Sequence, residues 1–304
     1  MDSRALATRA IRRAVKAPRL DHALPAGRMV ELPGRGRTYV IDVPGPEGAP
    51  TLVLLHSLAC TAYLGWYPAL EPLAEHFRVV AFDQRWHGRG IRSKRFRFDD
   101  CADDVAAVAD ALAVESFIPV GYSMGSPIAQ LVWRRHRERV DALVLCAAAR
   151  NYRGKTRERV FFPVMTGGMV FLSPYCRSRV DRLAAGLPEE PGIPGVADNW
   201  AIREFRSTSA WAMPAVLKEL GRFNSAGWVE EIDVPTAVVV TTKDHTIPVR
   251  RQRRLAESIP GATVHEVAGG HGSVVLGADR FLPALTEACL SVAARLPAAT
   301  RARA

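Results

Sequence analysis

The stretch Gly121-Tyr122-Ser123-Met124-Gly125 decides the fold. It directly follows the apolar run Phe117-Ile118-Pro119-Val120 and precedes a helical pattern at residues 128–136. A serine between two glycines at a strand-to-helix junction is typical of a sharp turn, because larger side chains two positions to either side would collide with the backbone. The pattern predicts that Ser123 lies on this turn with its hydroxyl exposed. The N-terminal end of the following helix would favour negative charge beside that hydroxyl.

A serine hydroxyl is a weak nucleophile, so this prediction requires a histidine to accept its proton and a carboxylate to orient that histidine. His271 stands in a glycine-rich segment, residues 269–272, after the last expected strand. Asp244 follows the apolar run 237–241, and strand ends of open α/β sheets face the ligand crevice. Taken singly, His271 is an ordinary loop histidine and Asp244 a turn aspartate. The order serine, aspartate, histidine at three expected strand ends predicts one catalytic site.

Cleavage of an acyl bond also needs two hydrogen-bond donors for the oxyanion, and one of them is the backbone N–H of the residue after the nucleophile. That residue is Met124. The second donor is expected from the loop after the strand at residues 51–56, and Leu58 N–H is the candidate. Any residue except proline can donate there, so the identity of the side chain does not test this prediction.

The chain contains eight histidines, and His56 and His87 are the main rivals for the base because both lie at expected strand ends. His56 precedes the nucleophile in the expected oxyanion segment, so a structural hydrogen bond is the preferred interpretation there. His136 and His265 fall on a helix end and inside a strand, where solvated or dipole-compensating roles suffice. The sequence has no zinc-binding pattern, so neither a metal nor a cofactor is expected.

From residue 28 onward, short β-rich runs alternate with helical stretches, which predicts an α/β fold with a mostly parallel central sheet flanked by helices. The strands are expected at residues 29–32, 38–43, 51–56, 77–83, 116–121, 142–148, 236–240 and 262–267, and the helices at 66–75, 99–108, 128–136, 250–258 and 281–295. A turn-rich segment at residues 33–36 predicts that the first two strands form an antiparallel hairpin. The acidic residues at 99–104 are expected to be solvated near the start of their helix.

The alternation stops between residues 149 and 231, where helical patches are broken by Gly167-Gly168 and a proline-rich run at 188–194. This predicts a helical cap at 149–231, inserted into a core formed by residues 28–148 and 232–297. Residues 1–27 are a basic N-terminal extension and 298–304 a tail. Within the extension, residues 4–16 have the spacing of a basic amphipathic helix, which either covers the protein surface or makes weak contact with an anionic membrane surface.

The composition, 48% hydrophobic and 24% charged residues, is typical of a globular protein. A net charge of +10 attracts polyanions, but the arginines are spread along the chain, so no nucleic-acid partner is expected. No apolar run is long enough to cross a bilayer and no signal peptide is evident, which favours a cytoplasmic location. The oligomeric state is left open. The cysteines have no paired or zinc spacing and are expected to be reduced thiols; they are Cys60, Cys101, Cys146, Cys176 and Cys289.

Residues from about 28 to 297 resemble the α/β-hydrolase superfamily, particularly its capped serine esterase and peroxidase-like branch. Beside the Ser123 elbow and the Asp244 and His271 pair, Leu55-His56-Ser57 is similar to the family's His-Gly loop, and the segment 83–90, DQRWHGRG, is similar to its Asp-x-x-Gly-x-Gly segment. The chain departs from the family at Ser57, where glycine is usual, and at Trp86-His87. These departures affect the expected shape of the pocket and not the triad.

The resemblance implies a carboxylesterase-like serine hydrolase that cleaves a carboxylic ester or similar acyl bond of a small molecule through an acyl-enzyme. Serine at the elbow, in place of aspartate, weighs against dehalogenation and epoxide opening. Two apolar runs of the expected cap, 160–165 and 168–172, either line a pocket for an apolar acyl group or only pack against the core. Three alternatives stay open: acyl transfer, carbon–carbon bond hydrolysis by the same triad, and a non-catalytic ligand sensor.

Overall fold

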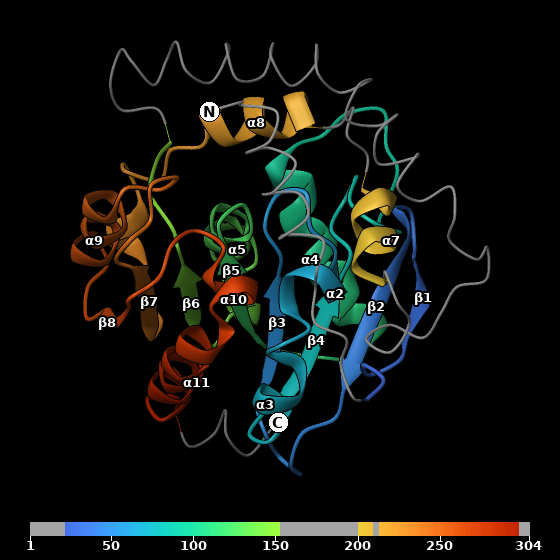
Figure 1. Ribbon diagram of the computed structural model, residues 1–304, viewed down its shortest axis with the longest axis horizontal. Helices are drawn as coiled ribbons and strands as arrows, with labels where there is room; N and C mark the ends of the chain where they lie inside the picture. The colour runs from blue at the N-terminus through green and yellow to red at the C-terminus, as the bar shows by residue number, and fades with distance from the viewer. Residues whose placement is uncertain (1–21, 153–199, 209–212, 298–304) are drawn as a thin grey trace, which may run out of the picture.

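The computed structural model describes residues 22–152, 200–208 and 213–297. An eight-stranded sheet forms its centre, with the strand order β1-β2-β4-β3-β5-β6-β7-β8 (Figure 1). The strands are β1 (Gly27–Leu32), β2 (Gly36–Val43), β3 (Thr51–Leu55), β4 (Arg78–Phe82), β5 (Ile118–Tyr122), β6 (Leu143–Cys146), β7 (Thr236–Thr241) and β8 (Thr263–Val267).

The pairing of the strands confirms the predicted hairpin and the mostly parallel sheet. β1 pairs with β2 in an antiparallel hairpin, and β2 is also antiparallel to β4. Strands β3 to β8 are parallel to their neighbours. Because the carboxyl ends of parallel strands meet at one edge of a sheet, the loops after β5, β7 and β8 converge there.

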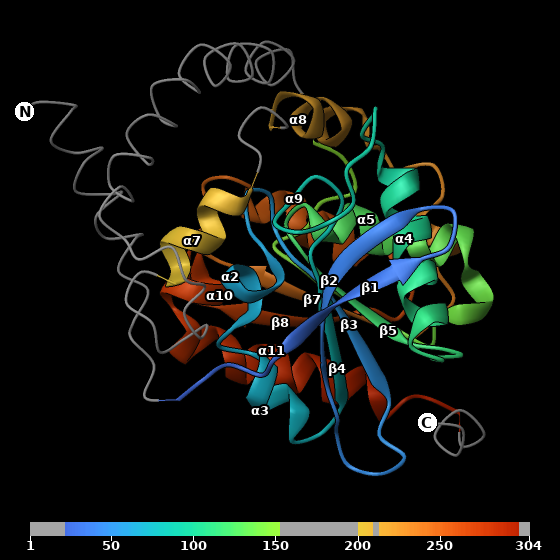
Figure 2. The same cartoon turned by 90° about the vertical axis from the view of Figure 1, so that its right-hand side faces the viewer.

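Helices cover both faces of the sheet (Figure 2). Short helices α2 (Ala62–Trp66) and α3 (Leu70–Ala74) and the long α11 (Ala278–Ala293) lie against one face, whereas α4 (Phe98–Ala111), α5 (Gly125–Arg135) and α9 (Val249–Ser258) lie against the other. The remaining described α-helices are α7 (Trp200–Ser207), α8 (Met213–Arg222) and α10 (Ser273–Leu276).

Alternation of side chains along the strands builds two apolar cores. In β3, Val53 and Leu55 join the cluster that contains α4 and α5, whereas Leu52 and Leu54 join the cluster with α2, α3 and α11. All four side chains are buried. A strand that is covered on both faces has a continuous apolar sequence, and this run predicts a buried strand.

Two of the differences between the expected and the observed helices have a local cause. The single helix expected at residues 66–75 is two helices, α2 and α3. Pro68 lies between them and has no N–H with which to continue the hydrogen bonds of a helix. Helix α5 begins at Gly125, three residues before the expected start at Ile128, because the turn at Ser123 leads directly into it.

The expectation that all acidic residues at 99–104 are solvated is wrong for Asp104. Only 1% of this residue is exposed. Its carboxylate accepts hydrogen bonds from Arg35 Nε at 2.7 Å and from Arg85 Nε and Nη2, both at 2.8 Å. The buried carboxylate therefore joins α4 to the β1–β2 turn and to the loop after β4.

The four described cysteines are free thiols: Cys60, Cys101, Cys146 and Cys289. Cys176, the apolar runs 160–165 and 168–172, the amphipathic segment 4–16 and the tail 298–304 lie outside the described residues. So does most of the expected cap, of which α7 and α8 are the described helices. No helix in the described part of the chain is both long and apolar enough to cross a membrane.

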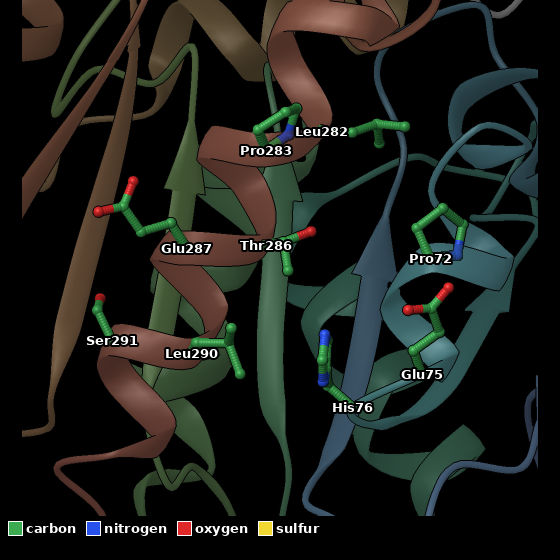
Figure 3. A pocket seen from close by; sticks show the side chains of 9 residues that line it. All are labelled: Pro72, Glu75, His76, Leu282, Pro283, Thr286, Glu287, Leu290 and Ser291. Carbon is green, nitrogen blue, oxygen red and sulfur yellow. The ribbon is translucent and has the colours of Figure 1, made fainter.

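A groove of about 690 Å³ lies between α3 and α11 (Figure 3). It is lined on one side by Pro72, Glu75 and His76 and on the other by α11 residues between Leu282 and Ser291. Neither Ser123 nor His271 lines it. This groove is therefore separate from the edge of the sheet at which the predicted site residues lie.

Candidate active site

Ser123 lies on the sharp turn between β5 and α5. Its backbone has a φ of +51°, in the left-handed region that residues other than glycine seldom adopt. Such a conformation costs on the order of 1–3 kcal/mol and persists only where the surroundings hold it. The Ser123 N–H donates to Cys146 O on β6 at 3.0 Å, which fixes the turn to the neighbouring strand. Only 7% of Ser123 is exposed, less than the sequence pattern predicts, because His271 lies against its hydroxyl.

The two glycines of the pentapeptide are required by close backbone contacts. A Cβ atom on Gly121 would lie 2.5 Å from Gly125 O, and a Cβ atom on Gly125 would overlap with Leu55 O on β3. These distances are far below ordinary van der Waals contact. The collision predicted from the sequence is thus present on both sides of Ser123.

The structure brings Ser123, His271 and Asp244 together in one hydrogen-bonded chain. Ser123 Oγ lies 2.8 Å from His271 Nε2, and His271 Nδ1 lies 2.7 Å from Asp244 Oδ2. Since an ionised carboxylate only accepts hydrogen bonds, Nδ1 carries the proton of a neutral His271 and Nε2 is left to accept one from the serine. Tyr122 Oη donates to His271 O at 2.8 Å and positions the backbone of the histidine loop.

Asp244 is kept ionised by its hydrogen bonds. Its Oδ1 accepts the N–H groups of Thr246 and Ile247, both at 2.8 Å. Thr241 Oγ1 donates to Oδ2 at 2.9 Å. Burial by itself raises the pKa of this carboxyl, but the hydrogen bond and charge of His271 and the other donors outweigh it, so the pKa lies below its usual value.

Gln252 is a site residue that the sequence reasoning missed. Its amide nitrogen donates to Ile247 O at 2.7 Å and its amide oxygen accepts Thr241 N–H at 3.0 Å, so it ties together the two ends of the Asp244 loop. The residue is completely buried on α9. A signal was available, because Gln252 is the one uncharged side chain in the run Arg250-Arg251-Gln252-Arg253-Arg254 and so marks the buried face of that helix.

The two rival histidines are held in structural roles. His56 Nδ1 donates to Ser57 O at 2.8 Å and its Nε2 accepts Gln84 N–H at 3.0 Å, so neither ring nitrogen is available to Ser123. His87 Nδ1 donates to Arg85 O at 3.0 Å. Burial lowers the pKa of His56 to about 4; burial and the neighbouring His56 lower that of His87 to about 3. Both imidazoles are therefore neutral across the physiological range.

The two expected oxyanion donors lie at the ends of neighbouring strands. Met124 follows Ser123 at the start of α5. Leu58 is in a tight turn after β3, closed by a hydrogen bond from Cys60 N to Ser57 O at 3.2 Å, with Ala59 at a φ of +62°. Leu58 packs against the apolar cluster that contains Met124. Within the described residues, no group of three or more histidine, cysteine or acidic side chains is placed to hold a metal ion.

Comparisons with known proteins agree with this fold. The model of the α/β-hydrolase fold family matches residues 50–165. A structure of a hydrolase from Pseudomonas aeruginosa superimposes with a TM-score of 0.70 at 19% identity, covering 86% of this chain and 98% of that one. The chain therefore has the α/β-hydrolase fold.

Two curated relatives each match most of the chain. It is 29% identical over 232 residues to the putative carbamate hydrolase RutD of Agrobacterium fabrum, which spans 70% of this chain and 82% of that protein. It is 27% identical over 264 residues to the pyrrolizixenacetamide deacetylase of Xenorhabdus hominickii, spanning 84% and 94% of the two chains.

Proposed function

We propose that this protein is a serine hydrolase that cleaves a carboxylic ester or a similar acyl bond through an acyl-enzyme. The observation that carries the proposal is the hydrogen-bonded chain of Ser123, His271 and Asp244, in which the serine Oγ lies 2.8 Å from a nitrogen that can accept its proton. The two relatives are named as a putative carbamate hydrolase and a deacetylase, and both names describe hydrolysis of acyl-type bonds, which is the class proposed for this chain.

In this mechanism Ser123 Oγ attacks the carbonyl carbon of the substrate while its proton passes to His271 Nε2. The carbonyl oxygen becomes an oxyanion, which the N–H groups of Met124 and Leu58 stabilise. When the tetrahedral intermediate collapses, the bond to the leaving group breaks and the leaving group takes the proton from His271. A water molecule then attacks the acyl-enzyme and gives a proton to His271. When this second tetrahedral intermediate collapses, the bond to Ser123 Oγ breaks, the serine takes the proton back from His271 and the acid is released.

Asp244 has two tasks in these steps. Its hydrogen bond from Nδ1 selects the tautomer of His271 that leaves Nε2 free, and its charge stabilises the imidazolium that forms during attack. Because the pKa of Asp244 lies below its usual value, the carboxylate stays ionised at neutral pH.

The proposal is tested by labelling wild type and Ser123→Ala with a fluorophosphonate probe, followed by turnover of p-nitrophenyl esters of increasing chain length. Labelling of wild type alone is the expected result, and the chain length with the highest kcat/KM measures the acyl pocket. Folded wild type that is not labelled and turns over no ester would overturn the proposal. Equal labelling of wild type and Ser123→Ala would place the reactive group elsewhere.

A further inference from the structure

We propose that Glu204 on α7 is a positioning residue that fixes the loop carrying Leu58 through the hydroxyl of Thr61. The geometry of the candidate oxyanion donor then depends on α7 and not on the core alone. This inference rests on the proposed function for its catalytic consequence, although the contact between α7 and the loop is independent of it.

Glu204 is a buried carboxyl at the boundary between α7 and the core. Only 9% of the residue is exposed. Its Oε2 accepts the Thr61 hydroxyl at 2.5 Å, and its Oε1 accepts Arg89 Nη2 at 3.1 Å. Since carboxylates are seldom buried without partners, two polar contacts to the core indicate that this side chain belongs to a specific junction.

Thr61 passes this contact on to the start of α2. As the N-cap of that helix, its Oγ1 accepts Leu64 N–H at 3.1 Å while its own proton is directed at Glu204. An N-cap hydrogen bond stabilises the first turn of its helix. Thr61 lies three residues after Leu58, directly beyond the turn that holds it. The two hydrogen bonds of the Thr61 hydroxyl therefore fix the position of the chain directly after this turn.

Asp83 holds the same helix start from the core side. Its Oδ1 accepts Ala62 N–H at 2.8 Å and its Oδ2 accepts Arg89 N–H at 2.8 Å. The guanidinium of Arg89 lies over the ring of Tyr39, 3.5 Å from its centroid, and is shared by the two acids. The start of α2 therefore donates hydrogen bonds to two carboxylates: Ala62 N–H to Asp83, in the loop after β4, and the Thr61 hydroxyl to Glu204 on α7.

Apolar contacts bring α7 to the same place. Trp200 packs edge-on against Tyr67, at the end of α2, with ring centroids 5.0 Å apart. Ala201 is also buried. Both views of the chain show α7 beside α2 (Figures 1 and 2). The apolar contacts attach the helix, whereas Glu204 is directed at the cap residue of α2.

The test compares Glu204→Gln and Thr61→Val with wild type. Thr61 and Arg89 donate to different oxygens of Glu204, and Glu204→Gln replaces one of these oxygens by an NH2 group, which only donates. Valine removes the Thr61 hydroxyl while keeping its shape. Thr61→Ser restores the hydroxyl and is the rescue variant. Glu219→Gln is the matched control, because Glu219 pairs with Arg222 on its own helix, α8.

Two measurements are made on the full chain: amide hydrogen exchange of residues 58–66, and the rate of fluorophosphonate labelling together with kcat and KM for p-nitrophenyl acetate. Glu204→Gln and Thr61→Val are expected to speed exchange in this segment about 10-fold and to lower the labelling rate and kcat about 10-fold, with KM within about threefold. In the double variant, kcat and the labelling rate are expected to fall by less than the product of the two single-variant factors, since both residues act through one hydrogen bond.

Exchange of residues 58–66 in Glu204→Gln equal to that of wild type would overturn the inference, whatever the activity. Faster exchange with unchanged labelling and kcat would overturn the positioning role. So would a failure of Thr61→Ser to restore the exchange rate and the labelling rate of wild type. In either case Glu204 would only attach α7 to the core. If wild type itself were unreactive towards probe and esters, the proposed function would fall, and the exchange result alone would decide whether the contact holds the loop.

Discussion

A Cβ atom on Gly121 would lie 2.5 Å from the carbonyl oxygen of Gly125, four residues farther along the chain. The turn that carries Ser123 therefore closes only if position 121 has no side chain. We expect Gly121→Ala to force the strand and helix apart, lowering the free energy of unfolding by about 1–3 kcal/mol and activity by a larger factor than this loss explains. Urea unfolding and ester turnover measure the two effects.

Gly227→Ala is the control for this prediction. Gly227 lies in a turn where an added Cβ atom would meet nothing within 4 Å. Its replacement is expected to change stability by less than about 0.5 kcal/mol. Equal effects of the two substitutions would show that the loss at position 121 is a general property of glycine and not of the turn.

The hydrogen bond from His271 Nδ1 to Asp244 makes a prediction about Asp244→Asn. An asparagine can present its amide hydrogens to the ring, which selects the tautomer with Nε2 protonated and unable to accept from Ser123. We expect kcat to fall by about 10⁴-fold while the protein stays folded. Asp233→Asn, at an exposed acid, is expected to leave kcat unchanged. A loss below tenfold for Asp244→Asn would remove Asp244 from the proposed mechanism.

Leu58→Pro separates the backbone donor at residue 58 from its side chain. Leu58 is the second residue of the turn closed by Cys60 N and Ser57 O, and the left-handed Ala59 is its third, a turn type that accepts proline at the second position. Proline removes the N–H together with the leucine side chain, and the loss of the donor is expected to lower kcat by about 10²–10³-fold. Leu58→Ala keeps the N–H and should lose less than about tenfold. Circular dichroism and kcat of both variants provide the check, and equal kcat values would assign the donor to another residue.

The residues at the three strand ends were predictable because their signals are local. Ser123 is marked by two glycines, and Asp244 and His271 each follow a recognisable strand. The contacts of Glu204 and Asp104 were not predictable, because each joins segments far apart in the sequence: Glu204 meets Thr61 and Asp104 meets Arg35. A buried acid has the same sequence appearance as a solvated one, and only the placement of its arginine or hydroxyl partner distinguishes the two.

The low pKa of the buried His87 is expected to lower the free energy of unfolding at mildly acidic pH. Its pKa in the folded protein is about 3, because of burial and the neighbouring His56, against about 6.5 in the unfolded chain. Below pH 6.5 the unfolded chain therefore binds more protons than the folded one, and stability falls as the pH falls. From pH 7.5 to 5.0, His87 is expected to account for a loss of about 2 kcal/mol.

The measurement is urea unfolding of wild type and His87→Asn at both pH values. An asparagine amide can still donate to Arg85 O, so the variant keeps the hydrogen bond of Nδ1 but has no titrating group. Its loss between the two pH values should be smaller than that of wild type by about 2 kcal/mol. The comparison removes the opposing effect of Asp83 and Glu204, whose pKa values are raised chiefly by burial and which favour the folded state as pH falls. Parallel pH dependences in the two proteins would contradict the assignment.

Two adjacent aspartates on α4 are expected to contribute very different amounts to stability. Asp104 is buried and pairs with Arg35 and with Arg85, whose side chain is only 8% exposed. Asp104→Asn would leave Arg85 buried without a countercharge, so we expect a loss of about 3–5 kcal/mol. Asp103 pairs with the more exposed Arg135, and Asp103→Asn is expected to cost at most about 1 kcal/mol. Urea unfolding in low and high salt distinguishes them, because salt screens only the exposed pair. Equal losses at low salt would mean that burial of the Arg85 pair does not govern its contribution.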